Sequence, residues 1–467
     1  MSEPDPDREA SERDTAVEGE RAPRAERAAG AAGAGWDGPF PLPYTLWVLG
    51  LALLVSAFNT LDRTIVSILV ERIKADFALS DTQLGLLMGP AFAVVYLFLV
   101  LPLARLADVW VRRTVIAASL FVWSLFTAAA SFTSTFAQLF AARMGVGVGE
   151  AGGTAPTASL LVDYLPQRHR ARGISVVSIG ATLGLGAGMI LGGVVAERWD
   201  WRAAFLAAGV PGMLLAFLFH ATVREPARGA SQRDGDATQP ALGDALRYLA
   251  TSPTFVVILV ANAASVFAAL GRNMWEPGFL IRIYEMGEVE AATWYFVTSP
   301  LPSAFGIWLG GRLADGLGAR DARWYLWIPA IGQAIGVPML VAFLLWPREH
   351  ELLGVPVALW WSAGGSIVGS FFTAPFIATI QNVAKLRMRA LASGVSTLVS
   401  TLVGLGAGPL LVGMTSDWIA PRYGSEAIRY SLLVPTIAPL ASALVCVAGA
   451  SRVARDLERA RRATTSG

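Results

Sequence analysis

Long apolar segments recur along the whole chain and constrain its fold more than any other feature. A helix needs roughly 20 apolar residues to cross a bilayer, because each residue adds about 1.5 Å. The segments fall into two groups of six, separated by the polar residues 224–243. Their ranges are 45–70, 82–107, 114–132, 136–165, 171–196 and 202–222, then 253–281, 291–313, 324–346, 355–383, 390–419 and 427–451. The sequence therefore predicts an all-α integral membrane protein whose twelve transmembrane helices form two six-helix bundles.

Composition argues against a soluble domain and shows no catalytic pattern. Charged residues make up 15% of the chain, against about 25% in soluble domains, and the mean hydropathy is +0.52. The net charge of +2 gives no reason to expect a nucleic-acid partner. The single cysteine, Cys446, and three scattered histidines show no disulfide or metal-ligand spacing, and no phosphate-binding glycine loop appears. We therefore expect no enzyme activity, no cofactor and no metal.

Polar segments divide the chain into five parts. The predicted divisions are a tail at 1–43, a bundle at 44–223, a linker at 224–250, a bundle at 251–452 and a tail at 453–467. The first tail mixes acidic and basic residues with Ala and Gly and lacks the apolar core of a signal peptide, so we predict disorder there. A short amphipathic helix is predicted near the end of the linker.

Lys and Arg are concentrated in the loops on one side of the predicted membrane. With the N-terminus inside, the inner loops 112–113, 168–172 and 385–389 each carry two or three of them. The basic residues of the outer loops mostly stand beside acids. Because positive residues mark the cytoplasmic side, the pattern predicts a multi-pass protein of the cell's inner (plasma) membrane with both termini in the cytoplasm.

The two groups of spans repeat one another. Residues 104–113 (ARLADVWVRR) lie between spans two and three, and residues 311–320 (GRLADGLGAR) lie between spans eight and nine. Spans five and eleven match too, with glycines at 184, 186, 188, 192 and 193 against 404, 406, 408 and 413. Chains built from such repeats are commonly transporters whose halves rock around a site near the membrane midplane.

The two Leu-Ala-Asp loops resemble the G-x-L-A-D-x-x-G-R-[KR] motif of the major facilitator superfamily, although Ala104 and Val111 replace both motif glycines in the first copy. The N-terminal bundle is similar to the Spinster branch, which includes sphingolipid and lysophospholipid transporters. The matching stretches are 59–63 (NTLDR), 79–87 (LSDTQLGLL), 143–151 (RMGVGVGEA), 199–205 (WDWRAAF) and 223–226 (VREP), with looser matches at 275–280 (WEPGFL) and 380–383 (IQNV). The resemblance implies alternating access, proton coupling and a central cavity lined by spans one, four, seven and ten.

Four charged residues stand in the middle region of spans one and four. Asp62 and Arg63 stand in the middle of span one, and Arg143 and Glu150 stand seven residues apart on one face of span four. Charges at this depth cost about 2.5–3.5 kcal/mol each on insertion scales, so they pair, face water or have a function. Two interpretations stand: a static brace between the spans, or a proton switch. In the second, Asp62 and Glu150 carry protons, and Arg63, Arg143 and Asn59 form a relay for charge and substrate.

The repeated loops supply candidate gate residues. Asp108 with Arg112, and Asp315 in the second loop, lie on the predicted cytoplasmic side, as do the amino ends of spans five and eleven. A carboxylate near a helix amino end gains roughly 0.3–1 kcal/mol. The superfamily resemblance implies that such contacts hold the cytoplasmic side shut. The alternative is a pair of solvated turn acids.

Spans seven and ten supply candidate cavity residues. Arg272, Asn273 and Glu276 interrupt span seven beside Pro277, which removes a backbone donor and predicts a kink or unwinding. They line the cavity or lie at the outer interface, and Arg272 and Glu276, four residues apart, could simply pair. Gln381 and Asn382 in span ten, like Gln333 in span nine, suit substrate contacts or helix-to-helix hydrogen bonds equally well. The glycines of spans five and eleven predict tight packing.

The sequence thus predicts a proton-coupled secondary active transporter. Its expected partners are the bilayer, protons and a small amphiphilic or anionic organic solute, lysophospholipid-like by family, and we expect a monomer. One alternative is a drug or metabolite exporter of the same superfamily. A non-transporting membrane receptor on the same fold is the other.

Overall fold

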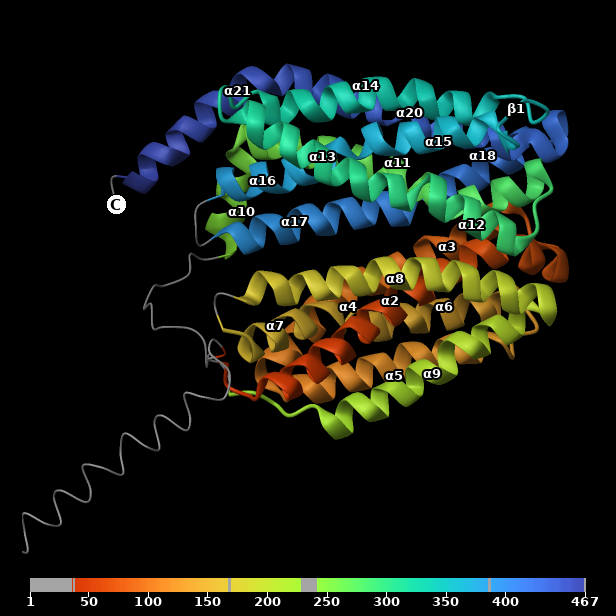
Figure 1. Cartoon of the computed structure of the whole chain (residues 1–467), viewed down its shortest axis with the longest axis horizontal. Coiled ribbons are helices and arrows are strands. Elements are labelled where there is room, and N and C mark those ends of the chain that lie inside the picture. The colour runs from red at the N-terminus through yellow and green to blue at the C-terminus, as the bar shows by residue number, and fades with distance from the viewer. Residues whose placement is uncertain (1–35, 37, 167–168, 228–241, 385–387, 466–467) are drawn as a thin grey trace, which may run out of the picture.

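The computed structural model describes residues 36, 38–166, 169–227, 242–384 and 388–465. Most of the predicted first tail, the middle of the linker and the last two residues lie outside the described residues. Two bundles lie side by side, and we call them the N-half (α2 to α9) and the C-half (α11 to α21) (Figure 1). The amphipathic helix predicted near the end of the linker is present as α10 (Leu242–Thr251).

The helices follow the predicted order. The N-half contains α2 (Leu42–Phe77), α3 (Asp81–Met88), α4 (Pro90–Val109), α5 (Arg112–Ala130), α6 (Phe136–Glu150), α7 (Thr154–Tyr164), α8 (Arg170–Arg198) and α9 (Trp201–Thr222). The C-half contains α11 (Pro253–Tyr284), α12 (Glu288–Thr298), α13 (Pro300–Gly318), α14 (Trp324–Leu345), β1 (Glu351–Leu352), β2 (Val355–Pro356), α15 (Val357–Gly369), η2 (Ser370–Phe372), α16 (Thr373–Val383), α17 (Arg389–Thr401), the π-helical turn η4 (Leu402–Ala407), α18 (Gly408–Tyr423), η5 (Gly424–Glu426), α19 (Ala427–Ser431), α20 (Leu433–Ile437) and α21 (Pro439–Thr465).

The predicted all-α membrane fold is confirmed. Within the described residues, nine helical stretches are long and apolar enough to cross a membrane. One of them, Leu391–Val453, turns at Gly424, where φ is 55°, and so holds two spans. The two remaining predicted spans are each broken in two, as α6 with α7 and α12 with α13. Twelve spans result. The short hairpin of β1 and β2 was not predicted.

The structure of span seven differs from the prediction. The predicted interruption at Pro277 is wrong in part, because α11 runs unbroken through this proline. Trp275 donates from its indole nitrogen to the carbonyl oxygen of Pro409 at 2.9 Å, and Phe279 is fully buried on the next turn. Proline is tolerated in a spanning helix when such neighbours hold the flanking turns. The helices break instead at Gly89, at Ser299 before Pro300, and at η2.

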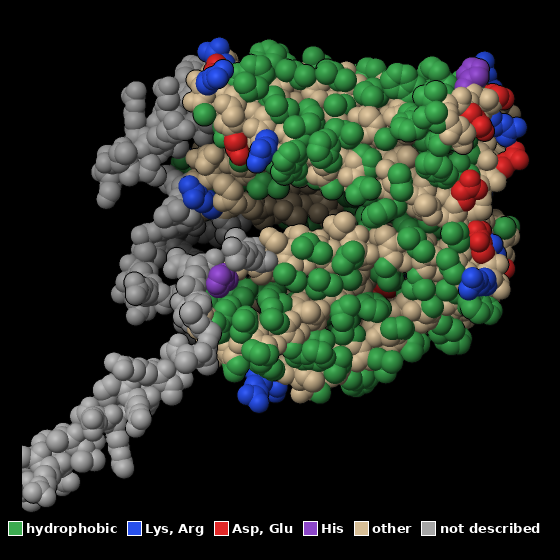
Figure 2. Space-filling view, viewed as in Figure 1, with side chains coloured by type: hydrophobic (Ala, Val, Ile, Leu, Met, Phe, Trp, Pro, Cys, Tyr) green, Lys and Arg blue, Asp and Glu red, His purple; other side chains and the backbone are tan. Residues whose placement is uncertain are grey.

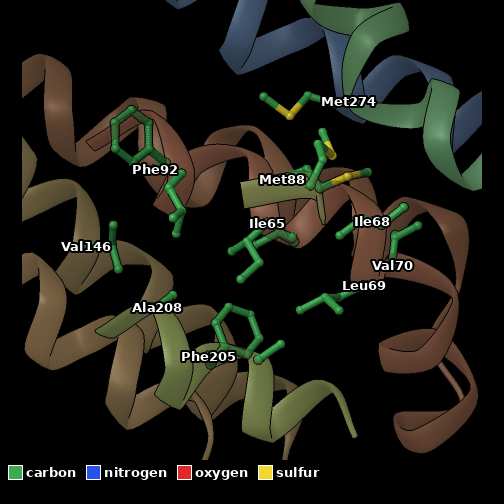
Figure 3. Packing of buried hydrophobic residues seen from close by; sticks show 14 of the residues in the cluster. Ile65, Ile68, Leu69, Val70, Met88, Phe92, Val146, Phe205, Ala208 and Met274 are labelled. Atoms are coloured by element: carbon green, nitrogen blue, oxygen red, sulfur yellow. The ribbon is translucent and has the colours of Figure 1, made fainter. Parts of the chain in front are cut away.

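Close helix packing explains the glycines of span five. A β-carbon on Gly184 would lie 2.0 Å from the backbone oxygen of Ala57, so only glycine lets α8 approach α2 this closely. Large apolar side chains fill the rest of the N-half core. Figure 3 shows Ile65 of α2, Phe92 of α4, Val146 of α6 and Phe205 of α9 among the buried cluster.

The two ends of the molecule differ. At the end that carries α10, Figure 2 shows a hollow between the two halves, and we call it the open end. At the opposite, closed end, charged side chains gather where the halves touch (Figure 2). The halves contact each other through α3 with α18, α8 with α12, α2 with α11, and α4 with η4. The two halves are therefore shut at one end of the molecule and open at the other.

Candidate functional site

The four charged residues of spans one and four meet inside the N-half. α2 carries Asp62 and Arg63, and α6 carries Arg143 and Glu150. Asp62 and Glu150 are fully buried, and Arg143 is 2% exposed. We call these four residues the buried charge cluster. The structure thus brings together the residues that the sequence singled out by their depth in apolar spans.

Arg63 and Glu150 of the buried charge cluster contact each other directly. The Nε of Arg63 forms an ion pair with the Oε2 of Glu150. The guanidinium carbon of Arg63 lies 4.7 Å from the ring centre of Phe92 and 5.4 Å from that of Tyr96, both on α4. Such cation–π contacts add about 0.5–1 kcal/mol at exposed sites and more when desolvated. The side chain of Arg63 is still 29% exposed. It therefore binds Glu150 and also has a surface that the protein does not cover.

The rest of the buried charge cluster is poorly satisfied. Arg143 donates from Nη1 to the backbone oxygen of Asp62 at 3.1 Å, while its Nε has no partner among the described residues. Within the same part of the chain, neither carboxyl oxygen of Asp62 has a hydrogen-bond partner, nor do the Oε1 of Glu150 and the Nδ2 of Asn59. Unpaired buried polar atoms cost about 1–3 kcal/mol each. A purely structural brace would pair them, so the arrangement suits groups that exchange protons or bind a ligand.

Two of the candidate residues of span seven, Arg272 and Glu276, are buried within the C-half and not at the outer interface, and Asn273 is half-buried. Arg272 is 8% exposed and Glu276 is 1% exposed, and they form the predicted pair at 3.2 Å between Nε and Oε2. Ser362 donates to Oε1 of Glu276 at 3.1 Å. Arg272 and Asn273 line a cavity that lies within the C-half.

The two polar residues of span ten lie elsewhere. Gln381 and Asn382 stand near the end of α16, and neither lines that cavity. Gln381 donates from Nε2 to Ser393 at 2.7 Å, and Asn382 is exposed. The geometry of Gln381 matches a helix-to-helix hydrogen bond.

The three predicted gate residues lie at the open end and behave differently. Asp108 and Asp315 are exposed, and Asp315 accepts a hydrogen bond from the hydroxyl of Tyr325 at 3.3 Å. Arg112 is 4% exposed and forms ion pairs with Asp163 at 2.6 Å and Glu225 at 2.7 Å. All of its described partners belong to the N-half or the segment after it. In this state Arg112 braces α5 against α7.

Asp315→Asn should favour the state seen here. Removing the charge forfeits an interaction with a helix amino end worth about 0.3–1 kcal/mol in the state closed at this end. We expect the population open at this end to rise several-fold. Distances between spin labels at Leu42 in the N-half and at Thr251 of α10, which packs against α11 of the C-half, would measure it. Asp321→Asn, at another exposed acid, is the control, and an unchanged distance distribution for Asp315→Asn would count against a gate role.

A network of ion pairs across the closed end was not predicted. Arg282 of α11 binds Asp81 of α3 through both terminal nitrogens, at 2.8 and 3.0 Å, and binds Glu71 of α2 at 2.7 Å. Arg72 of α2 pairs with Glu288 at the start of α12. These contacts join the N-half to the C-half, and bidentate Arg–carboxylate pairs are among the stronger ones. We call them, with the helix caps described next, the closed-end network.

Two helix amino ends at the closed end are capped from the opposite half. Asp417 of α18 accepts from the backbone N–H groups of Asp81 and Thr82 at 2.9 and 2.7 Å. Glu197 of α8 accepts from the backbone N–H of Val289 at 2.9 Å. Each carboxylate satisfies N–H groups that a helix start leaves unpaired. Ser80 and Gln83 form a capping box that completes the start of α3.

The repeat carries a signal that predicts these caps. Each of the glycines 184, 186, 188 and 193 lies 220 positions before another glycine. Glu197 likewise lies 220 positions before Asp417. An ideal β-carbon on Gly413 would lie 2.1 Å from the backbone oxygen of Asp81, and one on Gly193 would lie 3.1 Å from the backbone of Glu288. In both halves a glycine thus admits a helix start from the other half, and an acid one turn later caps it.

Comparisons with known proteins identify the family. The sequence profile of the Major Facilitator Superfamily matches residues 52–409. An MFS-type efflux pump of Mycolicibacterium smegmatis is 32% identical over 422 residues, which cover 89% of this chain and 95% of the relative. Protein spinster homolog 1 of Homo sapiens is 26% identical over 414 residues, covering 83% and 77%. These relatives agree with the resemblance noted in the N-terminal bundle.

A solved structure with a similar fold supports the family assignment. The crystal structure of a bacterial homologue of the human lysosomal transporter Spinster, in an inward-facing and unoccupied conformation, matches with a TM-score of 0.80 and 26% identity, covering 90% of this chain and 99% of the other. Family and fold are those of transporters and not of enzymes. The chain belongs to the major facilitator superfamily of membrane transporters, in its Spinster-like branch.

Proposed function

We propose that this transporter couples the movement of an organic solute to protons, and that Asp62 and Glu150 carry those protons. One observation carries the proposal: Glu150 is paired with Arg63, while Asp62 is buried beside them with no partner for either carboxyl oxygen among the described residues. An ionised carboxylate without a partner is costly in a water-free interior. Asp62 is therefore protonated in this state, and Glu150 is ionised.

The charge balance then indicates the substrate. With Asp62 neutral, the buried charge cluster holds two guanidinium groups and one carboxylate, so its net charge is positive. An anionic head group would restore neutrality, and the exposed part of Arg63 can bind a carboxylate or phosphate through two parallel hydrogen bonds. The rings of Phe92 and Tyr96 beside Arg63 suit an attached apolar chain. These features support a small anionic amphiphile such as a lysophospholipid.

The open end is the cytoplasmic one in this proposal. The basic inner loops of the sequence adjoin it, with Arg112 at the start of α5 and Arg389 at the start of α17. Both tails then lie in the cytoplasm, and the structure corresponds to an inward-open carrier. The similar solved structure is itself described as inward-facing. We expect the carrier to work as a monomer.

Export of drugs or metabolites is the second candidate. The relative from Mycolicibacterium smegmatis, an efflux pump by name, shares 32% of its residues over 89% of this chain. An exporter of this kind would use the same buried charge cluster and would move protons inward as solute moves out. The two candidates differ in substrate and not in coupling.

Reconstituted vesicles test both candidates. Purified protein in liposomes, with an imposed pH gradient, would be supplied with lysophosphatidylglycerol, lysophosphatidylcholine or a cationic dye used in efflux assays. Gradient-driven movement of the anionic lysolipid supports the first candidate, and movement of the dye supports the second. Equal movement with and without the gradient would contradict proton coupling.

A further inference from the structure

The C-half contains a partly open cavity of its own, separate from the buried charge cluster. It lies between α11, α13, α14, α15 with η2, and the junction of α20 and α21. Its volume is about 70 Å³, well above the roughly 10–15 Å³ that one water molecule needs. Arg272, Gln333, Ser366 and Thr436 contribute polar groups to its wall.

Three polar atoms of this wall have no hydrogen-bond partner in the part of the chain that the structure describes. They are the Oε1 of Gln333, the Oγ of Ser366 and the Oγ1 of Thr436, on residues that are each 2% exposed. Gln333 is held in place because its Nε2 donates to Ser265 at 2.6 Å. Buried polar groups are nearly always paired with protein, water or ligand. Their grouping around one space indicates a site that something polar fills.

The wall carries no net charge. Arg272 is neutralised by Glu276 at 3.2 Å, and its Nη2 donates to Asn273 and Ser299, each at 3.3 Å. An anion would therefore bring an uncompensated charge into the bundle. A phosphate or carboxylate would also leave the acceptor oxygen of Gln333 without a donor. A quaternary ammonium group has no hydrogen-bond donor and would face the guanidinium of Arg272.

Helix breaks border the cavity. η2 separates α15 from α16, and α20 ends just before Pro439, which lines the space. Irregular backbone at membrane depth is tolerated where it lines a cavity or is buried in protein. Gly369 also lines the space, and a β-carbon added there would meet no atom within 4 Å.

We propose that this cavity binds a compact, uncharged group bearing several hydroxyls, such as a sugar or glycerol head group. A hydroxyl both donates and accepts, so one such group can donate to Gln333 and exchange hydrogen bonds with Ser366 and Thr436. The proposal rests on the transporter fold alone. It does not depend on proton coupling by Asp62 and Glu150, because binding is measured at one pH and without a gradient.

Protection of a cysteine tests the site. The full chain in lipid nanodiscs would carry Cys446→Ala, which removes the one natural cysteine, and Ser370→Cys, a half-buried reporter on the cavity wall. A small methanethiosulfonate reagent modifies the reporter in the presence of octyl glucoside, octyl phosphate or octyltrimethylammonium. We expect octyl glucoside alone to slow the modification. Equal protection by all three would show that the octyl chain binds and would overturn the proposal.

Two variants separate recognition from folding. Gln333→Leu should weaken octyl glucoside about tenfold, the loss expected for one hydrogen bond of about 1.4 kcal/mol. The matched control, Gln138→Leu, alters an exposed glutamine at the start of α6 and should leave binding unchanged. Thr436→Val removes an unpaired buried hydroxyl without changing shape, so it should fold, and octyl glucoside should raise its melting temperature less than that of the parent. Full protection in both cavity variants, or no protection in the parent because water fills the cavity, would overturn the proposal.

Discussion

Asp62→Asn should yield a carrier that still exchanges its solute across the membrane but no longer concentrates it when a proton gradient is imposed. A gradient of one pH unit stores about 1.4 kcal/mol per proton, enough for about tenfold accumulation with one proton per solute. The amide mimics a permanently protonated Asp62, which is the form that we propose for this state. Uptake by vesicles with and without the gradient measures the ratio, which should fall from about ten to about one.

Stability data separate this prediction from misfolding. Asp62 is fully buried and its carboxyl oxygens lack partners among the described residues, so Asn costs no described hydrogen bond or ion pair. The melting temperature of Asp62→Asn should therefore match the parent. Glu150→Gln should also uncouple transport, but it removes the partner of Arg63 and should lower the melting temperature.

A conservative change outside the spans is the control. Asp244→Asn alters an exposed acid of α10 and should leave accumulation unchanged. If both Asp62→Asn and Glu150→Gln accumulate solute as the parent does, the buried charge cluster is only a brace between α2 and α6. The brace was the alternative that the sequence left open.

The buried charge cluster could be predicted because a charge in an apolar span is rare and costly. Asp62 and Glu150 stand out from their neighbours without any knowledge of contacts. The partners of Arg112 could not be predicted in this way. Asp163 and Glu225 lie 51 and 113 positions away from it, in α7 and in the segment after α9. The sequence around Arg112 does not indicate which distant acids will pair with it.

The closed-end network could be predicted from the sequence only in part. Its ion pairs depend on how the two halves dock, so local sequence patterns give little information about them. The register of the repeat does give some, because Glu197 and Asp417 occupy equivalent positions in the two halves. Extending the glycine match by one turn would have predicted both caps. Predicting the two caps required an alignment of the two halves along spans five and eleven, and the shared Leu-Ala-Asp loop motif alone was not enough.

Gly413→Ala should open the closed end. The added β-carbon would lie 2.1 Å from the backbone oxygen of Asp81, so α3 and α18 could not keep their present distance. Overpacking of this kind costs about 1–3 kcal/mol. The clash exists only while the halves touch here, so the cost falls on this state and favours the state open at this end. Since about 1.4 kcal/mol corresponds to a factor of ten, we expect a shift of about tenfold or more.

Asp417→Ala should act in the same direction through a different contact. It removes the two carboxylate oxygens that accept from Asp81 and Thr82 at the start of α3, and losing such a cap costs about 0.5–2 kcal/mol. Asp417→Asn keeps one acceptor oxygen, and its effect should be smaller. A graded series of Asp, Asn and Ala would therefore distinguish capping from a nonspecific loss of packing.

Spin labels at the closed end would measure these shifts. Ser134 follows α5 in the N-half and Glu351 lies in β1 of the C-half, and both are exposed at this end. The control is Gly394→Ala, the same change in the same span, at a glycine whose added β-carbon would meet no atom within 4 Å. Gly413→Ala should populate longer distances than the parent and Gly394→Ala should not, because only the first residue touches the opposite half. If both variants keep the distances of the parent, the contact between α3 and α18 does not hold the closed end shut, and the ion pairs of Arg282 would have to do so alone.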